Sequence, residues 1–297
     1  MASRATTFTL PAYATWSRFN APECLLFVVI HLMALSAPLV FSWTGAAACL
    51  VMTMALGQVG VIMGYHRMLA HGSFAAKAAL RYALVVLGVL SLQEGPISWA
   101  AIHRYHHLVS DRQADPHSPQ ISLIWAHWLW PFFRHPAFET YRAAHRLTPD
   151  LERDAGLQWL ERRRRLIVVV FIAVVAAAGF ASGGPSCAAS LLVWGYAIPV
   201  VYAWQMMLLG ASVNHTWGYR NYTTADNSRN TWWIALLSFG DGWHNNHHAY
   251  PRSAAHGHRW FEYDLTYRMI LCLNSFRLTF NVARPPVRPG RHTGARS

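Results

Sequence analysis

The sequence predicts an all-α integral membrane protein with four transmembrane helices and a histidine-rich di-iron site on one side of the membrane. Composition is the first reason: apolar residues make up 54% of the 297 residues, and charged residues only 13%. The second is that these apolar residues form long blocks, which is typical of membrane spans. The third is that many of the seventeen histidines gather at the ends of the blocks.

Four apolar blocks are candidates for membrane spans, each of which needs about 20 residues. We expect the spans at residues 24–43, 46–65, 166–181 and 187–213. Uncharged turns join the first span to the second and the third to the fourth. His31 interrupts the first span, and we interpret it as a polar packing contact rather than a metal ligand.

Two other apolar segments are not expected to cross the membrane. Residues 78–99 contain Arg81, Gln93 and Glu94, so we expect an interfacial or re-entrant helix there. Its end at Gly95-Pro96 is a helix-breaking signal. The other segment, Trp-rich residues 121–133, is too short to span and suits the headgroup zone.

Basic residues predict the orientation. Apart from the two uncharged turns, every connection carries Lys or Arg, and basic segments stay in the cytoplasm. Both termini and all histidine clusters would then be cytoplasmic. Four consecutive arginines, 162–165, adjoin the third span, which favours a stop signal over a nucleic-acid site. Residues 1–283 are expected to form one membrane domain, and residues 284–297 a disordered basic tail.

Eight histidines lie in three short clusters. These are His66 and His71; His103, His106 and His107; and His244, His247 and His248. The two triplets have i, i+3, i+4 spacing, which places three side chains on one face of a helix. The i, i+5 pair would point about 140° apart on an ideal helix, so that helix must end or distort between its two histidines.

The donor set favours iron. Imidazole suits redox metals, whereas structural zinc usually includes cysteine, and calcium and magnesium prefer oxygen. The four cysteines are far apart in the sequence and form no C-x-x-C pair. Neutral imidazoles do not compensate the positive charge of two metal ions, so nearby anions are needed. Asp111, Asp115 and Asp241 are candidates to hydrogen-bond the outer ring nitrogens. A loop-capping role is equally open for Asp111 and Asp115.

Five motifs carry a family resemblance. They are GYHRMLAH at 64–71, WAAIHRYHHLVSD at 99–111, DPHSP at 115–119, NHTWGYRNY at 214–222 and GDGWHNNHHAYPRSAAHG at 240–257. The chain resembles membrane fatty acid desaturases of the acyl-CoA (stearoyl-CoA, delta-9) type over nearly its whole length. The resemblance implies a four-helix membrane domain with a cytosolic helical cap that holds two irons.

The same resemblance assigns further residues. His215 would be a ninth metal ligand at the end of the fourth span. The Asn that relatives carry four residues earlier, where it holds a water at one iron, is Ala211 here, and Asp241 stands where relatives usually have Glu. Gln93 and Trp99 match positions that bend the acyl chain in a tunnel, and an interfacial anchor is the alternative role for Trp99.

The implied activity is oxygen-dependent desaturation of a saturated acyl chain, which introduces a cis double bond at the delta-9 position. An unactivated methylene is neither acidic nor electrophilic, so an oxidising metal–oxygen species is needed. We expect acyl-CoA as substrate, O2 as co-substrate, and an external electron donor such as ferredoxin with its reductase. A fatty acid hydroxylase, a decarboxylase that forms terminal alkenes and a metal-ion transporter are the alternatives. Nucleic acid is not an expected partner.

Overall fold

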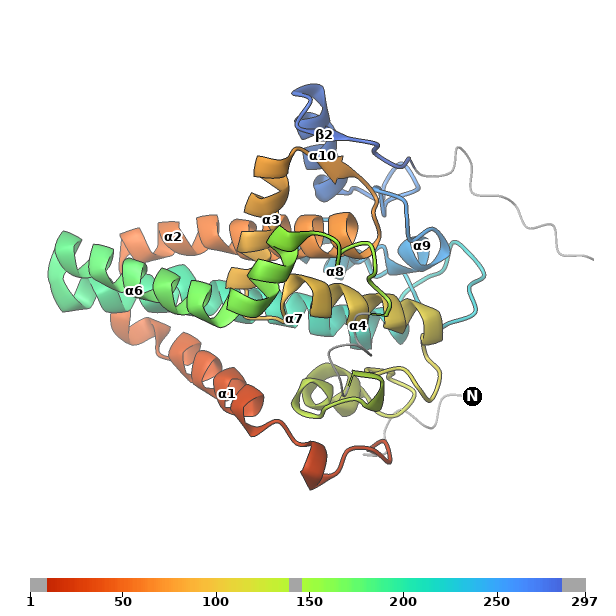
Figure 1. Cartoon of the computed structure of the whole chain (residues 1–297), viewed down its shortest axis with the longest axis horizontal. Helices are drawn as coiled ribbons and strands as arrows, with labels where there is room; N and C mark the ends of the chain where they lie inside the picture. Colours follow the sequence, from red (N-terminus) through yellow and green to blue (C-terminus); the bar gives the residue numbers. More distant parts are fainter. Residues whose placement is uncertain (1–9, 139–145, 285–297) are drawn as a thin grey trace, which may run out of the picture.

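The computed structural model describes residues 10–138 and 146–284, and its regular structure is almost entirely helical. Long helices run side by side and project from one end of the molecule (Figure 1). They are α2 (Trp43–Thr53) with its continuation η3 (Met54–Ala70), α6 (Ala155–Leu192) with η7 (Val193–Ala197), and α7 (Ile198–Ser212). Helix α1 (Ala21–Leu35) diverges from them.

Shorter elements gather at the opposite end (Figure 1). The helices are α3 (Ala78–Leu90), α4 (Pro96–Val109), α8 (Trp232–Leu237), α9 (His244–Ala249) and α10 (Leu265–Ser275). Strands β1 (Ala75–Ala76) and β2 (Thr279–Phe280) pair antiparallel, with Ala75 opposite Phe280. Single turns complete the set: η1 (Trp16–Arg18), η2 (Ala37–Val40), η4 (Trp125–Leu129), η5 (Trp130–Phe132), η6 (Pro136–Phe138) and η8 (Val213–His215).

The helical region from α6 to η8 reverses direction. Gly184 has φ +70°, a left-handed conformation that favours glycine, and Pro185 follows it. A Cβ on Gly179 would lie 2.6 Å from the Cα of Ala188, so the two arms of the reversal are in close contact. The turn that the sequence predicts at residues 182–186 therefore divides α6 into two antiparallel arms.

Two helical segments, Trp43–Ala70 and Ala155–His215, are long and apolar enough to cross a membrane. The second contains both arms of the reversal. The first predicted span, residues 24–43, is not one continuous α-helix. Helix α1 ends at Leu35, and the tight turn η2 follows it. Four membrane crossings therefore stay a prediction, as does the single-domain boundary at 283. The tail beyond Arg284 lies outside the described residues.

The segment 78–99 divides as its sequence suggests. Helix α3 ends at Leu90, and α4 begins at Pro96, whose ring suits the first turn of a helix. The buried Glu161 carboxylate of α6 accepts hydrogen bonds from Ile97 N (2.8 Å), Ser98 N (3.3 Å) and Ser98 Oγ (2.6 Å). An anionic partner at a helix N-terminus satisfies free backbone donors, and here it ties α4 to the long helices.

The core lies where η3 packs against α3. At Gly60 a Cβ would lie 2.5 Å from Leu87 C, and at Gly64 it would lie 3.0 Å from Leu84 O. These two glycines, four residues apart, let the two helices approach closely. Almost all of η3 is therefore buried, and its C-terminal end brings His66 and Arg67 into the interior.

Candidate metal centre

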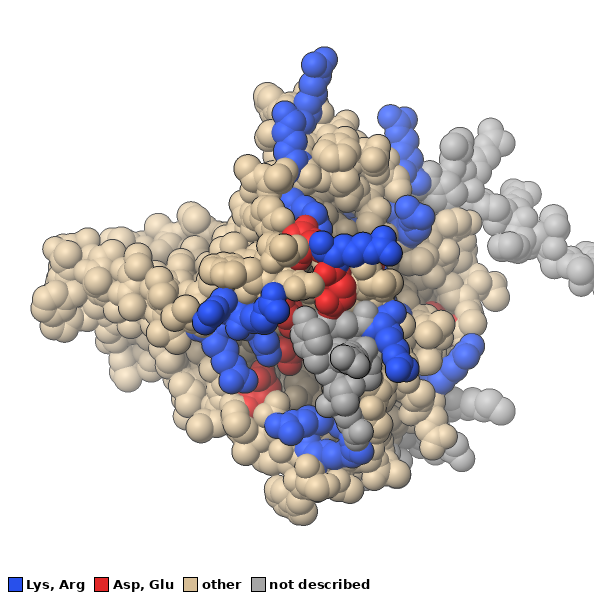
Figure 2. Space-filling model, viewed as in Figure 1, with Lys and Arg blue, Asp and Glu red and all other residues tan. Residues whose placement is uncertain are grey.

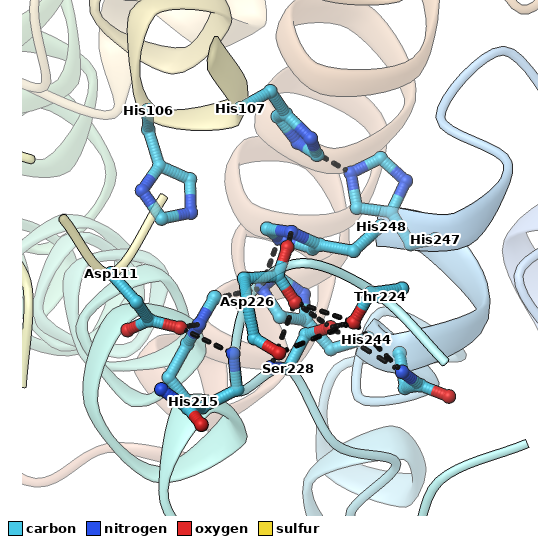
Figure 3. Close-up of polar contacts among 12 residues, drawn as sticks. His106, His107, Asp111, His215, Thr224, Asp226, Ser228, His244, His247 and His248 are labelled. Atoms are coloured by element: carbon cyan, nitrogen blue, oxygen red, sulfur yellow. Dashed lines mark hydrogen bonds and ion pairs between the residues drawn. The ribbon is translucent and has the colours of Figure 1, made fainter. Parts of the chain in front are cut away.

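The two histidine triplets lie on α4 and α9, and each triplet serves two sets. His103 and His107 of α4 join one set, whereas His106 joins the other. On α9 the division is reversed: His244 and His248 belong to the set of His106, and the His247 between them crosses to the set of His103. Figure 3 shows His106 and His107 reaching from α4 toward the α9 histidines.

The i, i+5 pair is explained by the winding of η3. This element is π-helical, with hydrogen bonds between residues five apart. The last of them joins His71 N to His66 O over 3.2 Å. The distortion that the spacing requires is therefore present, and the rings of His66 and His71 lie 5.0 Å apart between centroids.

All nine histidines assigned from the sequence come together in two sets. The first set comprises His66, His71, His103, His107 and His247, and the second comprises His106, His215, His244 and His248. Within each set the candidate ligand atoms all lie within 4.8 Å of one another. Ring centroids of His106 and His107, which belong to different sets, are 5.6 Å apart, so the two sets adjoin.

The spacing of the inner nitrogens fits shared cations. In the first set, neighbouring Nε2 atoms are 2.8–3.1 Å apart, for example 3.0 Å between His66 and His247. In the second set, His244 Nε2 lies 3.1 Å from His215 Nε2 and 3.0 Å from His248 Nε2. Imidazole nitrogens bind zinc-sized divalent metals at about 2.0–2.1 Å, so two ligands at right angles are about 3 Å apart.

Carboxylates accept hydrogen bonds from the outer nitrogens of four of these rings. The Nδ1–O distances are 3.2 Å for His66–Asp241, 3.0 Å for His106–Asp115, 2.9 Å for His215–Asp111 and 2.7 Å for His248–Asp226. A neutral ring that donates its Nδ1–H keeps a lone pair on Nε2, which is the ligand form. The donor set thus fits two metal ions, with five nitrogen donors for one and four for the other.

One of these carboxylates, Asp226, is not among the residues predicted from the sequence. Asp226 lies in a loop, where it also accepts hydrogen bonds from Ser228 N (3.0 Å) and Thr224 Oγ1 (2.7 Å) (Figure 3). The chain has only 13 acidic residues, so an Asp between the fourth span and the last histidine cluster was a usable signal. Loop capping and histidine binding are not exclusive here, because Asp111 also accepts from Asn227 N (2.6 Å).

Two further histidines border the sets. His256 Nδ1 lies 3.1 Å from Asp241 Oδ1, and its ring packs 4.3 Å from that of His247. His117 packs 4.2 Å from His106 and lies near Asp115. His31 lies apart from both sets: its Nδ1 is 2.8 Å from Phe27 O, and its Nε2 is 3.3 Å from Gln205 Nε2.

Burial determines the charge states. Burial lowers the pKa of His107 and of the three α9 histidines well below its ordinary value, and neighbouring imidazoles lower it further. Burial by itself would raise the pKa of Asp115, but the charges of His106 and His117 and the His106 hydrogen bond hold it below its usual range. The site therefore combines neutral rings with ionised carboxylates, as metal binding requires.

An apolar cavity of about 290 Å³ reaches both sets. His66 and His103 of the first set and His106 and His244 of the second line it, together with Phe27, Ile62, Trp204 and Met207. Gln93 and Trp99 also line it: Trp99 Nε1 donates to Gln93 Oε1 over 2.8 Å, and the Trp99 ring stacks 5.1 Å from His103.

The segment around Ala211 departs from the family pattern as the sequence indicates. Ala211 lines the cavity but offers no polar side-chain atom. Asn214, beside His215, lines the same cavity, and its buried Oδ1 has no hydrogen-bond partner among the described residues. The cavity wall therefore carries an amide at position 214 and none at position 211.

Comparisons with known proteins agree on the family. A model of the fatty acid desaturase family matches residues 41–272. The sn-2 palmitoyl-lipid 9-desaturase of Nostoc sp. (strain 36) is 35% identical over 281 residues, 93% of this chain and 96% of that protein. The sn-1 stearoyl-lipid 9-desaturase of Anabaena variabilis is 36% identical over 273 residues, 91% and 96% of the two chains.

A plant protein gives a similar match. The delta-9 acyl-lipid desaturase 1 of Arabidopsis thaliana is 33% identical over 271 residues, which are 91% of this chain and 85% of that protein. Because the family model covers most of the chain and these relatives match it nearly end to end, the protein is an enzyme of the fatty acid desaturase family.

Proposed function

We propose that this enzyme introduces a cis double bond at the delta-9 position of a saturated acyl chain at a di-iron centre. One observation supports the proposal above others: two adjoining sets of histidines border a common apolar cavity. A metal-ion transporter would keep its ligands within the membrane spans. Family membership removes that alternative.

Each turnover would consume one O2, two electrons and two protons. The acyl chain loses two hydrogen atoms from adjacent methylenes, and two water molecules leave. Bound iron would supply the oxygen chemistry that no amino-acid side chain can perform on an unactivated methylene. His66, His71, His103, His107 and His247 would hold one ion, and His106, His215, His244 and His248 the other.

The protein's own residues position the substrate and exclude water. Trp99 and Gln93 form a hydrogen-bonded pair in the cavity wall, and Trp99 also packs on His103. A methylene beside Trp99 would therefore lie next to the first histidine set, in a cavity that also reaches the second. Orientation of one carbon pair beside the reacting centre accounts for regioselectivity, because all methylenes of a saturated chain are chemically alike.

The substrate we favour is an acyl chain esterified to a membrane lipid. The cyanobacterial relatives and the Arabidopsis relative are named as acyl-lipid desaturases. The motifs alone imply acyl-CoA, which is the alternative substrate. A lipid-linked chain would enter from the membrane, and the two long apolar helical segments agree with a membrane location. We retain four spans, with the termini and the metal centre on the cytoplasmic side, as part of this proposal.

The electrons would come from a separate protein, for which we propose ferredoxin with its reductase. Lys and Arg side chains are spread over the face in Figure 2, with few acidic side chains among them. The chain carries a formal charge of +12, which favours an acidic partner.

Product analysis tests this function. The protein is expressed in a host without delta-9 desaturase activity, and the lipid acyl chains are analysed by mass spectrometry. We expect a new cis double bond between carbons 9 and 10, formed faster from lipid-linked chains than from acyl-CoA in purified assays. A hydroxylated chain or a terminal alkene would instead support one of the two other di-iron outcomes.

A further inference from the structure

A second hollow opens at the surface, and it shares no lining residue with the apolar cavity. Residues 222–226 and 248–250 line it together with His107, and we call it the outer hollow. Thr223, Ala225 and Tyr250 on its walls are exposed. His107 of the first histidine set and His248 of the second both line the outer hollow, and neither lines the apolar cavity beside Trp99.

These two rings form a contact between the sets. Their centroids are 4.3 Å apart and their planes differ by only 28°, so the rings are stacked. His107 Nε2 also lies 3.0 Å from His247 Nε2 in the first set, and His248 Nε2 lies 3.0 Å from His244 Nε2 in the second. Figure 3 shows His107 and His248 together with Asp226 and Thr224 of the loop that borders them.

The lining of the outer hollow does not suit an acyl chain. Thr224, Asp226 and the tyrosine hydroxyls make it polar, in contrast to the cavity beside Trp99. The Asp226 carboxylate is largely buried and faces inward: its Oδ2 lies 2.7 Å from His248 Nδ1, and its Oδ1 accepts from Ser228 N and Ser228 Oγ.

Two arginines form the rim of the outer hollow as we define it: Arg220 contacts the lining loop, and Arg252 follows the lining residue Tyr250 closely in the chain. Arg220 Nη2 donates to Thr224 O over 3.1 Å and to Thr224 Oγ1 over 2.7 Å, so it lies against the lining loop. Arg252 is exposed and follows two residues after Tyr250, in a turn where Ser253 N donates to Tyr250 O over 2.9 Å. A positive rim attracts an acidic protein and orients its approach.

We propose that an acidic one-electron carrier of the ferredoxin class docks over the outer hollow and delivers electrons through the stacked pair His107–His248. This inference rests on the proposed desaturase function. Two reduced carriers are each oxidised by one electron per turnover, and those two electrons, with two protons and the two hydrogens of the substrate, reduce O2 to two water molecules. Because one ring belongs to each set, a single docking position serves both.

The test compares two reductants on the full-length, iron-loaded enzyme. Arg252→Glu reverses a rim charge, and Ala225→Trp fills the outer hollow; neither residue belongs to the proposed metal ligands. With a reduced acidic [2Fe–2S] ferredoxin at low salt, we expect each variant to be reduced about tenfold more slowly than the unmodified enzyme. With dithionite, a small reductant, all three proteins should be reduced at similar rates, which shows that the variants are folded.

Arg163→Glu is the matched control, because it makes the same charge change at an exposed position of α6. We expect it to keep the ferredoxin rate. The proposal is overturned if Arg252→Glu and Ala225→Trp react with ferredoxin as fast as the unmodified enzyme, or if Arg163→Glu alone slows the reaction. Failure of the desaturase function is distinguishable: the unmodified enzyme, reduced by dithionite and given O2 and lipid, would then form no double bond.

Discussion

The carboxylates behind the histidines determine which ring nitrogen faces inward at each site. Asp226 and Asp115 contact His248 and His106 through Nδ1 and leave Nε2 directed at the centre of a set. A carboxylate acceptor also makes the ring a better electron donor to a metal. These contacts therefore act on metal affinity rather than on the fold alone.

Asp226→Asn should weaken metal binding. The amide oxygen can keep the bonds from Ser228 and Thr224, but the negative charge against His248 is lost. Loss of such a partner typically costs about 10–100-fold in metal affinity, and we expect about tenfold for this isosteric change. Iron retained during dialysis against a chelator measures it. Asp150→Asn alters an exposed carboxylate that belongs to neither set and contacts no histidine among the described residues, so this variant should retain iron like the unmodified enzyme.

Protonation should destabilise the metal-free protein. Burial and the charge of His106 lower the pKa of His117 to about 3, and burial and the charge of Arg67 lower that of His256 to about 4. Between these lowered pKa values and the pKa of about 6.5 in the unfolded chain, the unfolded chain binds more protons than the folded one. The free energy of unfolding is therefore highest above about pH 6.5 and decreases as the pH falls. His106 opposes this trend: burial lowers its pKa, but Asp115, Asp111 and Asp226 together raise it above the ordinary value.

We therefore expect the thermal unfolding temperature of the metal-free protein in detergent to fall between pH 7 and pH 5. A mild increase over the same range would mean that His106 outweighs all the histidines whose pKa is lowered. Replacing His117 and His256 by Gln should make the fall shallower without abolishing it, because His107 and the α9 histidines, whose pKa burial also lowers, still take up protons on unfolding.

At the scale of elements, local signals predict local structure well. The break before α4 follows from Gly95-Pro96, and the reversal in α6 follows from Gly183, Gly184 and Pro185. The i, i+5 spacing of His66 and His71 predicts a distorted helix, and η3 supplies it by π-helical winding. The extent of that winding does not follow from the spacing, because it covers residues far before His66 that pack against α3.

We expect the Glu161 carboxylate, which caps the N-terminus of α4, to contribute strongly to the free energy of unfolding, although it lies in a basic segment. Glu161→Ala leaves three donors at the start of α4 without their acceptor, which should cost about 1–3 kcal/mol. Thermal unfolding in detergent measures the loss. Glu94→Ala removes a partly exposed ion pair with Arg164, and it should cost less than about 1 kcal/mol. Equal losses of stability in the two variants would show that the Glu161 cap contributes no more than an exposed ion pair.

At the scale of the whole molecule, the sequence identifies the nine histidines but not their division. The split depends on how α4 and α9 face each other across η3 and η8, which is a long-range arrangement. Asp226 was missed for the same reason, since its partner His248 lies 22 residues away on another element. Family motifs supply the ninth histidine, His215, because nothing in its own spacing marks it.

Metal analysis of the purified enzyme tests whether the two histidine sets bind two iron ions. Two sets of nitrogen donors, five in one and four in the other, should hold two iron ions per chain. Elemental analysis by mass spectrometry should give two irons per chain, and Mössbauer spectra of protein loaded with iron-57 should show two inequivalent sites of equal weight. One iron per chain, or stoichiometric zinc in its place, would contradict the account.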